Sequence, residues 1–143
     1  MLSGEYEPSP WAPIAAQVEL YERTGGEEGY DLQGQPCIIL WTTGRSTGKV
    51  RKSPLMRVEH EGRYAVVASL GGAPQHPTWY GNMIADPKVS LQDKAELHDY
   101  VARQVEGEEK AEWWARAVAV WPSYDDYQAS TERVIPLLVL ERI

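Results

Sequence analysis

The chain of 143 residues has 43% hydrophobic residues and a formal net charge of -7, which excludes a disordered chain and fits one domain, residues 1–143, with one core. The negative charge argues against non-specific binding to nucleic acid, because neutralising phosphates needs a cationic surface. The single cysteine, Cys37, excludes an intramolecular disulfide and a multi-cysteine metal site, and it favours a reducing compartment, with the cytoplasm as the expected location.

Residues 1–35 are expected to form an N-terminal helix and loop. No run approaches the roughly 20 apolar residues that span a bilayer, and the start of the chain lacks the features of a signal peptide. An amphipathic helix is predicted over residues 13–23 from the apolar stripe of Trp11, Ile14, Val18 and Tyr21. This stripe fits a helix that covers an open side of a barrel. It also fits a lid or membrane-surface helix, although its acidic polar face suits anionic lipids poorly.

Residues 36–143 are expected to form the barrel. The apolar, β-branched run 37–43 predicts a buried strand, and a turn follows over residues 44–48. Two further strands, 52–59 and 63–69, flank Glu61 and Gly62. Because Gly62 can supply the positive φ of a tight turn, these two strands are predicted to pair as an antiparallel hairpin.

The second half of the chain alternates between strands and helices. A short helix is predicted over 78–85, and strands over 88–92 and 95–105 with Lys94 at their turn. Residues 108–121 predict the longest helix, with the apolar stripe Trp114, Val118 and Trp121, followed by a short helix over 124–130 and a strand over 134–140. About six mainly antiparallel strands with flanking helices indicate an α+β, mainly β, fold: a small barrel.

A basic turn follows the first buried strand. Five cations and no acid lie between Trp41 and Val58, namely Arg45, Lys49, Arg51, Lys52 and Arg57. Together with the nearby hydroxyls and glycine N–H groups, they suit phosphate or carboxylate oxygens. A solvated basic turn is the simpler alternative. The spacing does not match a P-loop.

A glycine-rich loop, Ser69-Leu70-Gly71-Gly72-Ala73, follows the third strand. Its glycines would let the backbone approach a flat ring closely. Trp79 and Tyr80 follow this loop and would either wall a ring-binding cleft or pack in the core. The three histidines lack the spacing of a metal site, so His60, His76 and His98 are expected on the surface or in loops.

Tyr124 and Tyr127 share one face of the short helix near the C-terminus. A phenol beside a cleft can donate a hydrogen bond or a proton, whereas simple packing of both rings explains the spacing equally well. No Ser/His/Asp or Cys/His arrangement stands out, so nucleophilic hydrolysis has little support.

Three segments carry a resemblance to a known family: TTGRSTGKVRKSPL (residues 42–55), VVASLGGAPQHPTWYGNMIADPKV (66–89) and WPSYDDYQASTERVIPLLVLE (121–141). In order and spacing they resemble the deazaflavin (F420)-dependent nitroreductase family of actinobacteria, of the nitroimidazole-activating type. The resemblance implies a split β-barrel like that of FMN-binding proteins, no metal, and the cofactor coenzyme F420, an 8-hydroxy-5-deazaflavin with a phosphate and a glutamate tail. It further implies an oxidoreductase that passes a hydride from reduced F420 (F420H2) to a quinone or nitro acceptor.

The resemblance also assigns site residues. Proton delivery would fall to Tyr124, Tyr127, Ser69 or solvent. Cofactor binding is implied for Arg45, Ser46, Thr47, Arg51, Lys52, Ser53, Pro54, Leu55, Met56, Val67, Ala68, Ser69, Leu70, Thr78, Trp79, Tyr80, Gly81, Asn82 and Tyr124. The nitroimidazole-activating type has lysines or tyrosines where this chain has Ser46, Leu70, Met56 and Trp121, so quinone reduction is the better-supported activity.

Two alternatives to this enzyme remain at the level of sequence. One is a non-catalytic F420-binding or carrier protein. The other is a split-barrel protein that binds FMN or haem, and FMN is then the alternative cofactor to F420. A weak peripheral association with the inner face of the membrane is expected, because quinones are carried in lipid. The sequence leaves the oligomeric state open.

Overall fold

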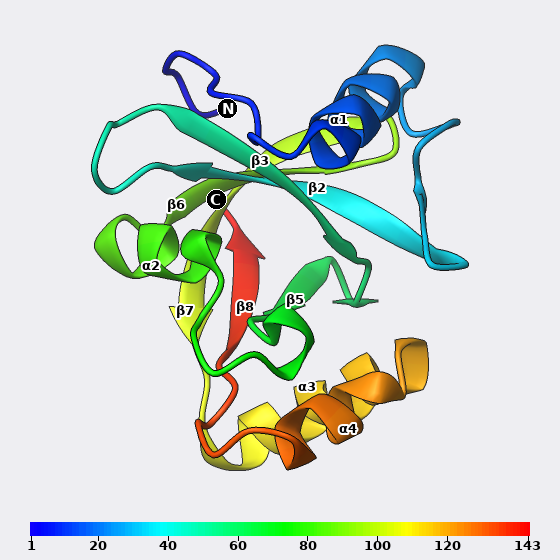
Figure 1. Ribbon diagram of the computed structural model, residues 1–143, viewed down its shortest axis with the longest axis vertical. Coiled ribbons are helices and arrows are strands. Elements are labelled where there is room, and N and C mark those ends of the chain that lie inside the picture. Colours follow the sequence, from blue (N-terminus) through cyan, green and yellow to red (C-terminus); the bar gives the residue numbers. More distant parts are fainter.

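One antiparallel sheet of eight strands forms the body of the protein, and the computed structural model describes all residues, 1–143 (Figure 1). The strands are β1 (Asp31–Leu32), β2 (Gln35–Thr43), β3 (Val50–Met56), β4 (Glu59–His60), β5 (Arg63–Val67), β6 (Lys88–Asp93), β7 (Glu96–Gln104) and β8 (Leu137–Arg142). The helices are α1 (Ala12–Thr24), α2 (Thr78–Ala85), α3 (Gly107–Val120) and α4 (Ser123–Ala129), and a 3-10 turn, η1, covers Leu70–Gly72.

The strand order explains why the barrel is split. The order is β1-β2-β6-β7-β8-β5-β4, and β3 pairs with β2 outside this path. The sheet curls so that β3 and β5 face each other across an opening instead of pairing (Figure 1). Six of the strands have five or more residues. The expected α+β split barrel is therefore confirmed.

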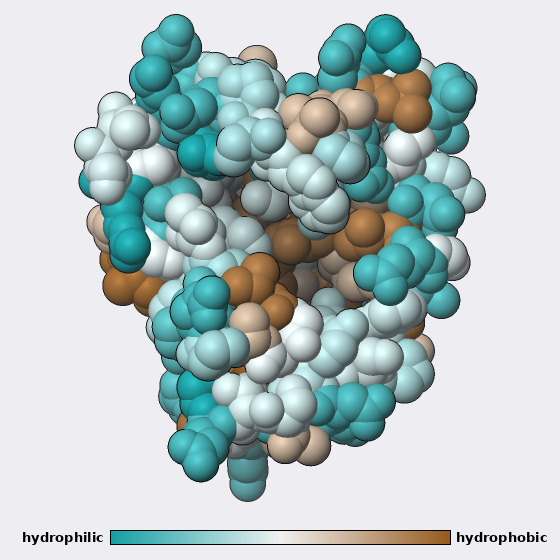
Figure 2. All heavy atoms as spheres, in the orientation of Figure 1, coloured by the Kyte–Doolittle hydropathy of each residue, from teal (hydrophilic) through white to brown (hydrophobic).

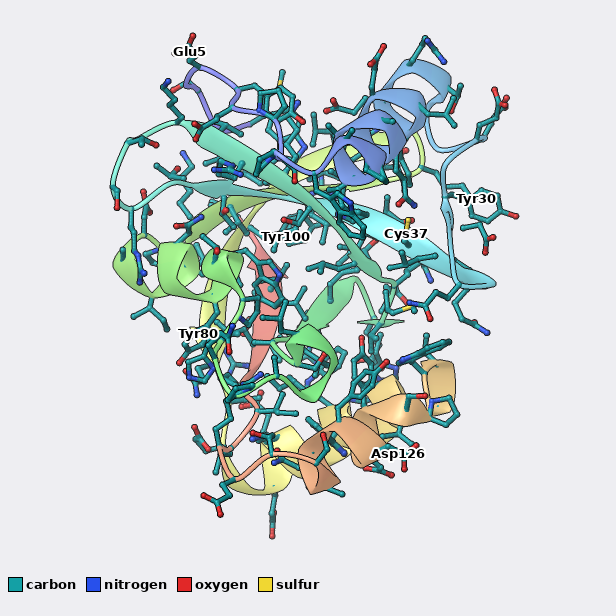
Figure 3. The ribbon with its side chains drawn as sticks, viewed as in Figure 1. Glu5, Tyr30, Cys37, Tyr80, Tyr100 and Asp126 are labelled. Atoms are coloured by element: carbon teal, nitrogen blue, oxygen red, sulfur yellow. The ribbon has the colours of Figure 1, made fainter.

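The alternation of side chains along β2 divides the core into layers. Ile38 and Leu40 point into the barrel, where they join a cluster of buried side chains from β5, β6, β7 and β8. Cys37, Ile39 and Trp41 point to the other face, beneath α1. Figure 3 shows this separation, with Tyr100 among the strands of the barrel and Cys37 near α1.

Helix α1 covers the outer face of β2 and β3, as the covering interpretation of its apolar stripe predicts. Val18 and Tyr21 are buried against β2, and the Tyr21 hydroxyl donates to the carbonyl of Cys37 at 3.1 Å. The helix ends where Gly25 adopts the left-handed conformation, with φ of 61°. Trp11, just before the helix, remains 65% exposed.

The predicted hairpin of residues 52–59 with 63–69 is wrong for most of its length. Strand β3 ends at Met56 and pairs with β2 along its whole length, and only Glu59 and His60 pair with β5. The tight turn at Glu61 and Gly62 does form, since both residues have positive φ. Periodicity and turn signals show where a strand lies, but not which of two neighbours it pairs with.

The predicted apolar stripe of α3 packs against the core, but it is not the buried face of the helix. Trp113 and Ala117 form the buried face, packed near β5 and β8, whereas Trp114, Val118 and Trp121 lie half-buried at its margin. Because adjacent positions 113 and 114 are both tryptophan, the pattern alone does not show which face is turned inward. The last strand begins at Leu137, three residues later than expected, after Pro136.

None of the helices is both long enough and apolar enough to cross a membrane.

We expect Trp113→Ala to lower the free energy of unfolding by about 3–5 kcal/mol, because the side chain is 1% exposed and its loss leaves a cavity. Urea denaturation monitored by circular dichroism would measure the change. The matched control is Trp114→Ala on the neighbouring position, which should cost clearly less because that ring is only partly buried. An equal or larger loss for Trp114→Ala would contradict this assignment of the buried face.

Candidate functional site

A cleft of about 560 Å³ lies between β3 and β5, where the barrel is split. Figure 2 shows it as a brown hollow between the upper and lower halves of the molecule. Most of its lining is apolar. The lining residues are Trp11, Ile14, Leu32, Gln33, Ser53, Pro54, Leu55, Met56, Val67, Ser69, Leu70, Gly71, Pro77, Trp79, Trp121, Tyr124 and Tyr127.

A smaller cavity of about 200 Å³ continues the cleft towards α2 and the N-terminal segment. It shares Ile14, Ser53, Leu70, Pro77 and Trp79 with the cleft, and it adds a polar set of Ser9, Arg51, Lys52, Thr78 and Asn82. The cleft therefore has an apolar body and a polar end.

A groove of about 520 Å³ follows on the far side of Thr78, along α2. Arg45 reaches it from the β2–β3 turn and lies against the backbone of Gly81, so a side chain at position 81 would meet the guanidinium. Arg45 forms no ion pair. This groove therefore carries an unneutralised cation beside the polar end of the cleft.

The structure brings most of the predicted site residues together in these three spaces. Tyr127, Tyr124, Ser69 and the predicted cofactor-binding residues line one or more of them, with three exceptions. Ser46 and Thr47 lie exposed in the β2–β3 turn, and Ala68 is fully buried in the barrel core. Sequence reasoning did not single out Leu32, Gln33 or Pro77, because nothing in their local pattern distinguishes them from ordinary loop residues.

The cations of the basic turn are mostly neutralised by acids from elsewhere in the chain. The pairs are Lys49 with Glu5 at 3.6 Å, Arg51 with Glu7 at 3.0 Å, Lys52 with Glu22 at 2.7 Å, and Arg57 with Asp93 at 2.8 Å. Of the five, only Arg45 is unpaired. The local absence of acids in the sequence thus overstates the free positive charge.

The N-terminal segment supplies two of these acids by running along the free edge of β3. Tyr6 forms a parallel bridge with Val50, and backbone bonds join Val50 to Glu5 and Glu7 on either side. Side chains alternate along an extended segment, so Glu5 and Glu7 point to the side opposite Tyr6. Glu7 thereby reaches Arg51, whose side chain is 30% exposed.

Alternation also separates Lys52 from Arg51. Lys52 pairs in register with Trp41, and its ammonium lies 4.0 Å from the centroid of the Trp41 ring, on the α1 side of the sheet. Its side chain is only 10% exposed. Arg51 pairs in register with Thr42 and points to the cleft side of the sheet. Of these two neighbours, Arg51 is the one available to an anion.

Asn82 fixes the geometry at the polar end. Its amide is 2% exposed; it donates to the Thr42 hydroxyl and accepts from the backbone N–H of Arg45, both at 3.1 Å. Because α2 is thereby tied to the end of β2, Arg45 is held over Gly81.

The loop after β5 forms the floor of the cleft. Leu70, Gly71 and Gly72 all have positive φ, of 46°, 62° and 84°. A Cβ at Gly72 would collide with Ser130 and lie 3.0 Å from the carbonyl of Tyr127, so the loop packs directly on α4. Leu70 adopts a conformation that costs a non-glycine residue about 1 kcal/mol or more, which makes this a strained segment at the centre of the candidate site.

Several hydroxyl groups line the apolar body of the cleft. Ser69 is 7% exposed, and its hydroxyl has no hydrogen-bond partner in the chain. Tyr124 is buried to the same extent, and this burial raises the pKa of its phenol, so the group stays protonated and can donate a hydrogen bond. The Tyr127 hydroxyl already accepts from the indole of Trp121 at 3.2 Å.

Arg133 is a site residue that sequence reasoning missed. It follows α4 and places its guanidinium on backbone carbonyls of the floor loop, with the shortest distance, 2.6 Å, to Ser69. Nothing in its local sequence distinguishes it from a surface arginine.

Comparison with known proteins gives a consistent picture. The sequence model of a family described as F420H(2)-dependent quinone reductase matches residues 14–142. An F420H(2)-dependent quinone reductase of Mycobacterium tuberculosis is 32% identical over 129 residues, which cover 86% of this chain and 85% of that protein.

Two solved structures are also similar. A structure described as an F420-H2 dependent reductase (FDR-A) is 50% identical with a TM-score of 0.71, over 74% of this chain and 94% of that one. A second, described as a domain-swapped dimer, is 44% identical with a TM-score of 0.74, over 93% of this chain and 100% of that one.

Asn82→Ala should lower the free energy of unfolding by about 1–3 kcal/mol, because it leaves the Thr42 hydroxyl and the Arg45 N–H without their partner. A double-mutant cycle with Thr42→Val, measured by urea denaturation, should show a coupling energy of about 0.5 kcal/mol or more. Strictly additive losses would show that the two side chains do not act together.

Proposed function

The chain belongs to the F420H(2)-dependent quinone reductase family, and on this basis we propose that it is an oxidoreductase that binds reduced coenzyme F420 and transfers a hydride to a quinone, or to a nitro compound as a second class of acceptor. One observation carries the proposal: an apolar, ring-sized cleft shares its walls with a polar end that holds Arg51, and this end adjoins a groove with the free Arg45.

The residues present fit coenzyme F420. A flat, largely apolar ring suits the body of the cleft, where Leu55, Met56 and Trp79 supply apolar walls. The phosphate suits the polar end, where Arg51, Thr78 and Asn82 lie, and the glutamate tail suits the groove beside Arg45. When bound, the reduced deazaflavin supplies the hydride, that is, two electrons and one hydrogen nucleus.

The chain itself has two tasks in this reaction. The first is to hold the two reactants together in a cleft with little water, which the apolar lining favours. The second is to complete the proton balance, because conversion of a quinone to a hydroquinone takes up one proton in addition to the hydride. Ser53, Ser69 and Tyr124 line the cleft with hydroxyls that have no hydrogen-bond partner in the chain. We assign the donor role towards the oxygen of the acceptor to the two buried ones, Ser69 and Tyr124. Tyr127 serves as a secondary donor.

Glu7 is an internal competitor of the cofactor phosphate. Its carboxylate already occupies the Arg51 guanidinium at 3.0 Å, so an anion entering the polar end must displace it or share the arginine. Glu7 is held by backbone bonds of its own segment to β3, which keep it close to Arg51 after displacement. The affinity for the cofactor therefore depends on how much stronger the contact of Arg51 with the phosphate is than its contact with the Glu7 carboxylate.

We further propose a weak contact between the mouth of the cleft and a lipid surface. Trp11, which is 65% exposed, and Leu70, which is 48% exposed, both border it. Glu19 and Glu22 on α1 oppose strong binding to anionic lipids. A quinone with an apolar tail could enter from such a position.

We expect Arg51→Ala to weaken F420 binding by about tenfold, because one charge-assisted bond to phosphate is lost. Glu7→Gln should act in the opposite direction and tighten binding several-fold, because the competing carboxylate becomes neutral. Quenching of F420 fluorescence gives both dissociation constants.

The matched control is Glu5→Gln, which removes the same charge from the same segment but pairs with Lys49 at the outer edge of the molecule (Figure 3). Its dissociation constant should stay within about twofold of wild type at physiological ionic strength, since exposed charges are screened. If Glu5→Gln and Glu7→Gln tighten binding equally, the effect is one of net charge and the competition is refuted.

Turnover tests the activity itself. Purified protein with reduced F420 should reduce menadione, and both Ser69→Ala and Tyr124→Phe should lower kcat by about 100-fold, the loss expected for a preorganised donor. Tyr127→Phe should lower it by less than about threefold, because its half-buried phenol is only the secondary donor. Tight F420 binding without any turnover would refute the enzyme and support a carrier.

A further inference from the structure

Arg133 lies in an unusual environment for an arginine. Its guanidinium donates to the carbonyls of Ala73 at 2.8 Å, Ala68 at 3.1 Å and Ser69 at 2.6 Å, and it lies 2.9 Å from Nδ1 of His76. No carboxylate lies within ion-pair distance. Three carbonyl oxygens therefore take the place of the usual counter-ion.

These carbonyls come from both ends of the floor loop. Ala68 and Ser69 precede η1, and Ala73 follows it, so one planar guanidinium spans the strained turn in which Leu70 has φ of 46°. The five fixed donors of arginine suit such a fork, whereas a lysine ammonium lacks the geometry. The clamp stabilises a conformation that Leu70 would not adopt alone.

The clamp also helps to set where the opposite ends of these peptides point, together with the N–H of Gly72, which donates to the same Ser69 carbonyl at 2.9 Å. In a trans peptide the C=O and the N–H point in opposite directions, so a Ser69 carbonyl turned to Arg133 leaves the Leu70 N–H pointing away from it. Arg133 does not line the cleft, whereas Ser69 and Leu70 do. The Leu70 N–H has no hydrogen-bond partner in the chain. It is thus a free donor next to the free hydroxyl of Ser69.

We propose that Arg133 is a positioning residue that turns the Ser69–Leu70 peptide so that the Leu70 N–H and the Ser69 hydroxyl form a donor pair at the floor of the cleft. The positive charge on the carbonyl end polarises the peptide and strengthens its N–H as a donor. The group that this pair receives is a carbonyl or anionic oxygen at the rim of a flat ring. The inference rests on the proposed function, in which F420 and a quinone both carry such oxygens.

The first test is chemical rescue. Arg133→Ala should lower kcat for menadione with reduced F420 by about 100-fold. Free guanidinium, at concentrations far below denaturing ones, should restore at least tenfold of this loss by entering the vacated site. Urea has a similar shape but no charge and should not restore it. Arg23→Ala, which removes an exposed arginine of α1, should keep wild-type kcat with and without guanidinium.

Two outcomes of the rescue test would overturn the proposal. They are an unchanged kcat in Arg133→Ala, and equal rescue by urea and guanidinium. If Arg133 had only a structural role, Arg133→Ala would lower the melting temperature but leave kcat per folded molecule unchanged. The folded fraction is obtained by titrating the F420-binding sites, and kcat is divided by this fraction.

The second test uses the wild-type protein and does not depend on the folding of a variant. In a ¹H–¹⁵N correlation spectrum, the Leu70 amide proton should move downfield when F420 binds, because it gains an acceptor. Movement of other amides of the cleft without Leu70 would refute the role of Arg133 while leaving cofactor binding intact. If no resonance moves at all, the proposed function itself fails.

Discussion

The pairing of β3 with β2, and not with β5, is the constraint on which the site depends. Seven consecutive residue pairs, from Thr43 with Val50 to Cys37 with Met56, fix β3 on one neighbour. Were β3 to pair with β5 as well, the barrel would close and no cleft would remain. The free edge of β3 is partly satisfied by backbone bonds to Glu5 and Glu7, so the opening does not leave all of its N–H and C=O groups without partners.

The register of that pairing also distributes the charges. Alternate residues of β3 point to opposite faces, so Arg51 and Ser53 border the cleft. Lys52 also lines the polar end, but its ammonium lies over Trp41 and pairs with Glu22 of α1. Two cations that are adjacent in the sequence thus have different roles: Arg51 faces the proposed ligand, and Lys52 forms an ion pair with Glu22 of α1. Acids from distant segments pair with the other cations of the turn. Arg45, at the groove, is therefore the one cation of the turn without an ion pair.

Sequence patterns predicted most of the elements, because each depends on local periodicity and turn chemistry. What they could not predict depends on contacts between distant residues. Glu7 and Arg51 are 44 positions apart, and Arg133 and Ser69 are 64 apart, so neither pair leaves a local signal. The buried face of α3 could not be predicted for another reason. Trp113 and Trp114 are equally apolar, and only the position of β5 and β8 decides which of them is buried. The resemblance gave most of the candidate cleft residues because it carries tertiary information that spacing lacks.

The segment 121–133 holds together two parts of the cleft lining, α4 and the floor loop. Trp121 at the end of α3 and Tyr124 and Tyr127 on α4 line the cleft, and Arg133 a few residues later clamps the floor loop. Gly72 in that loop packs on the backbone of Tyr127, so the floor and α4 touch directly as well. A ligand in the cleft would contact both surfaces, and one short stretch of chain holds them in register. Displacement of α4 would therefore move the tyrosine hydroxyls and disturb the packing of the floor loop at the same time, because Gly72 rests on the backbone of Tyr127.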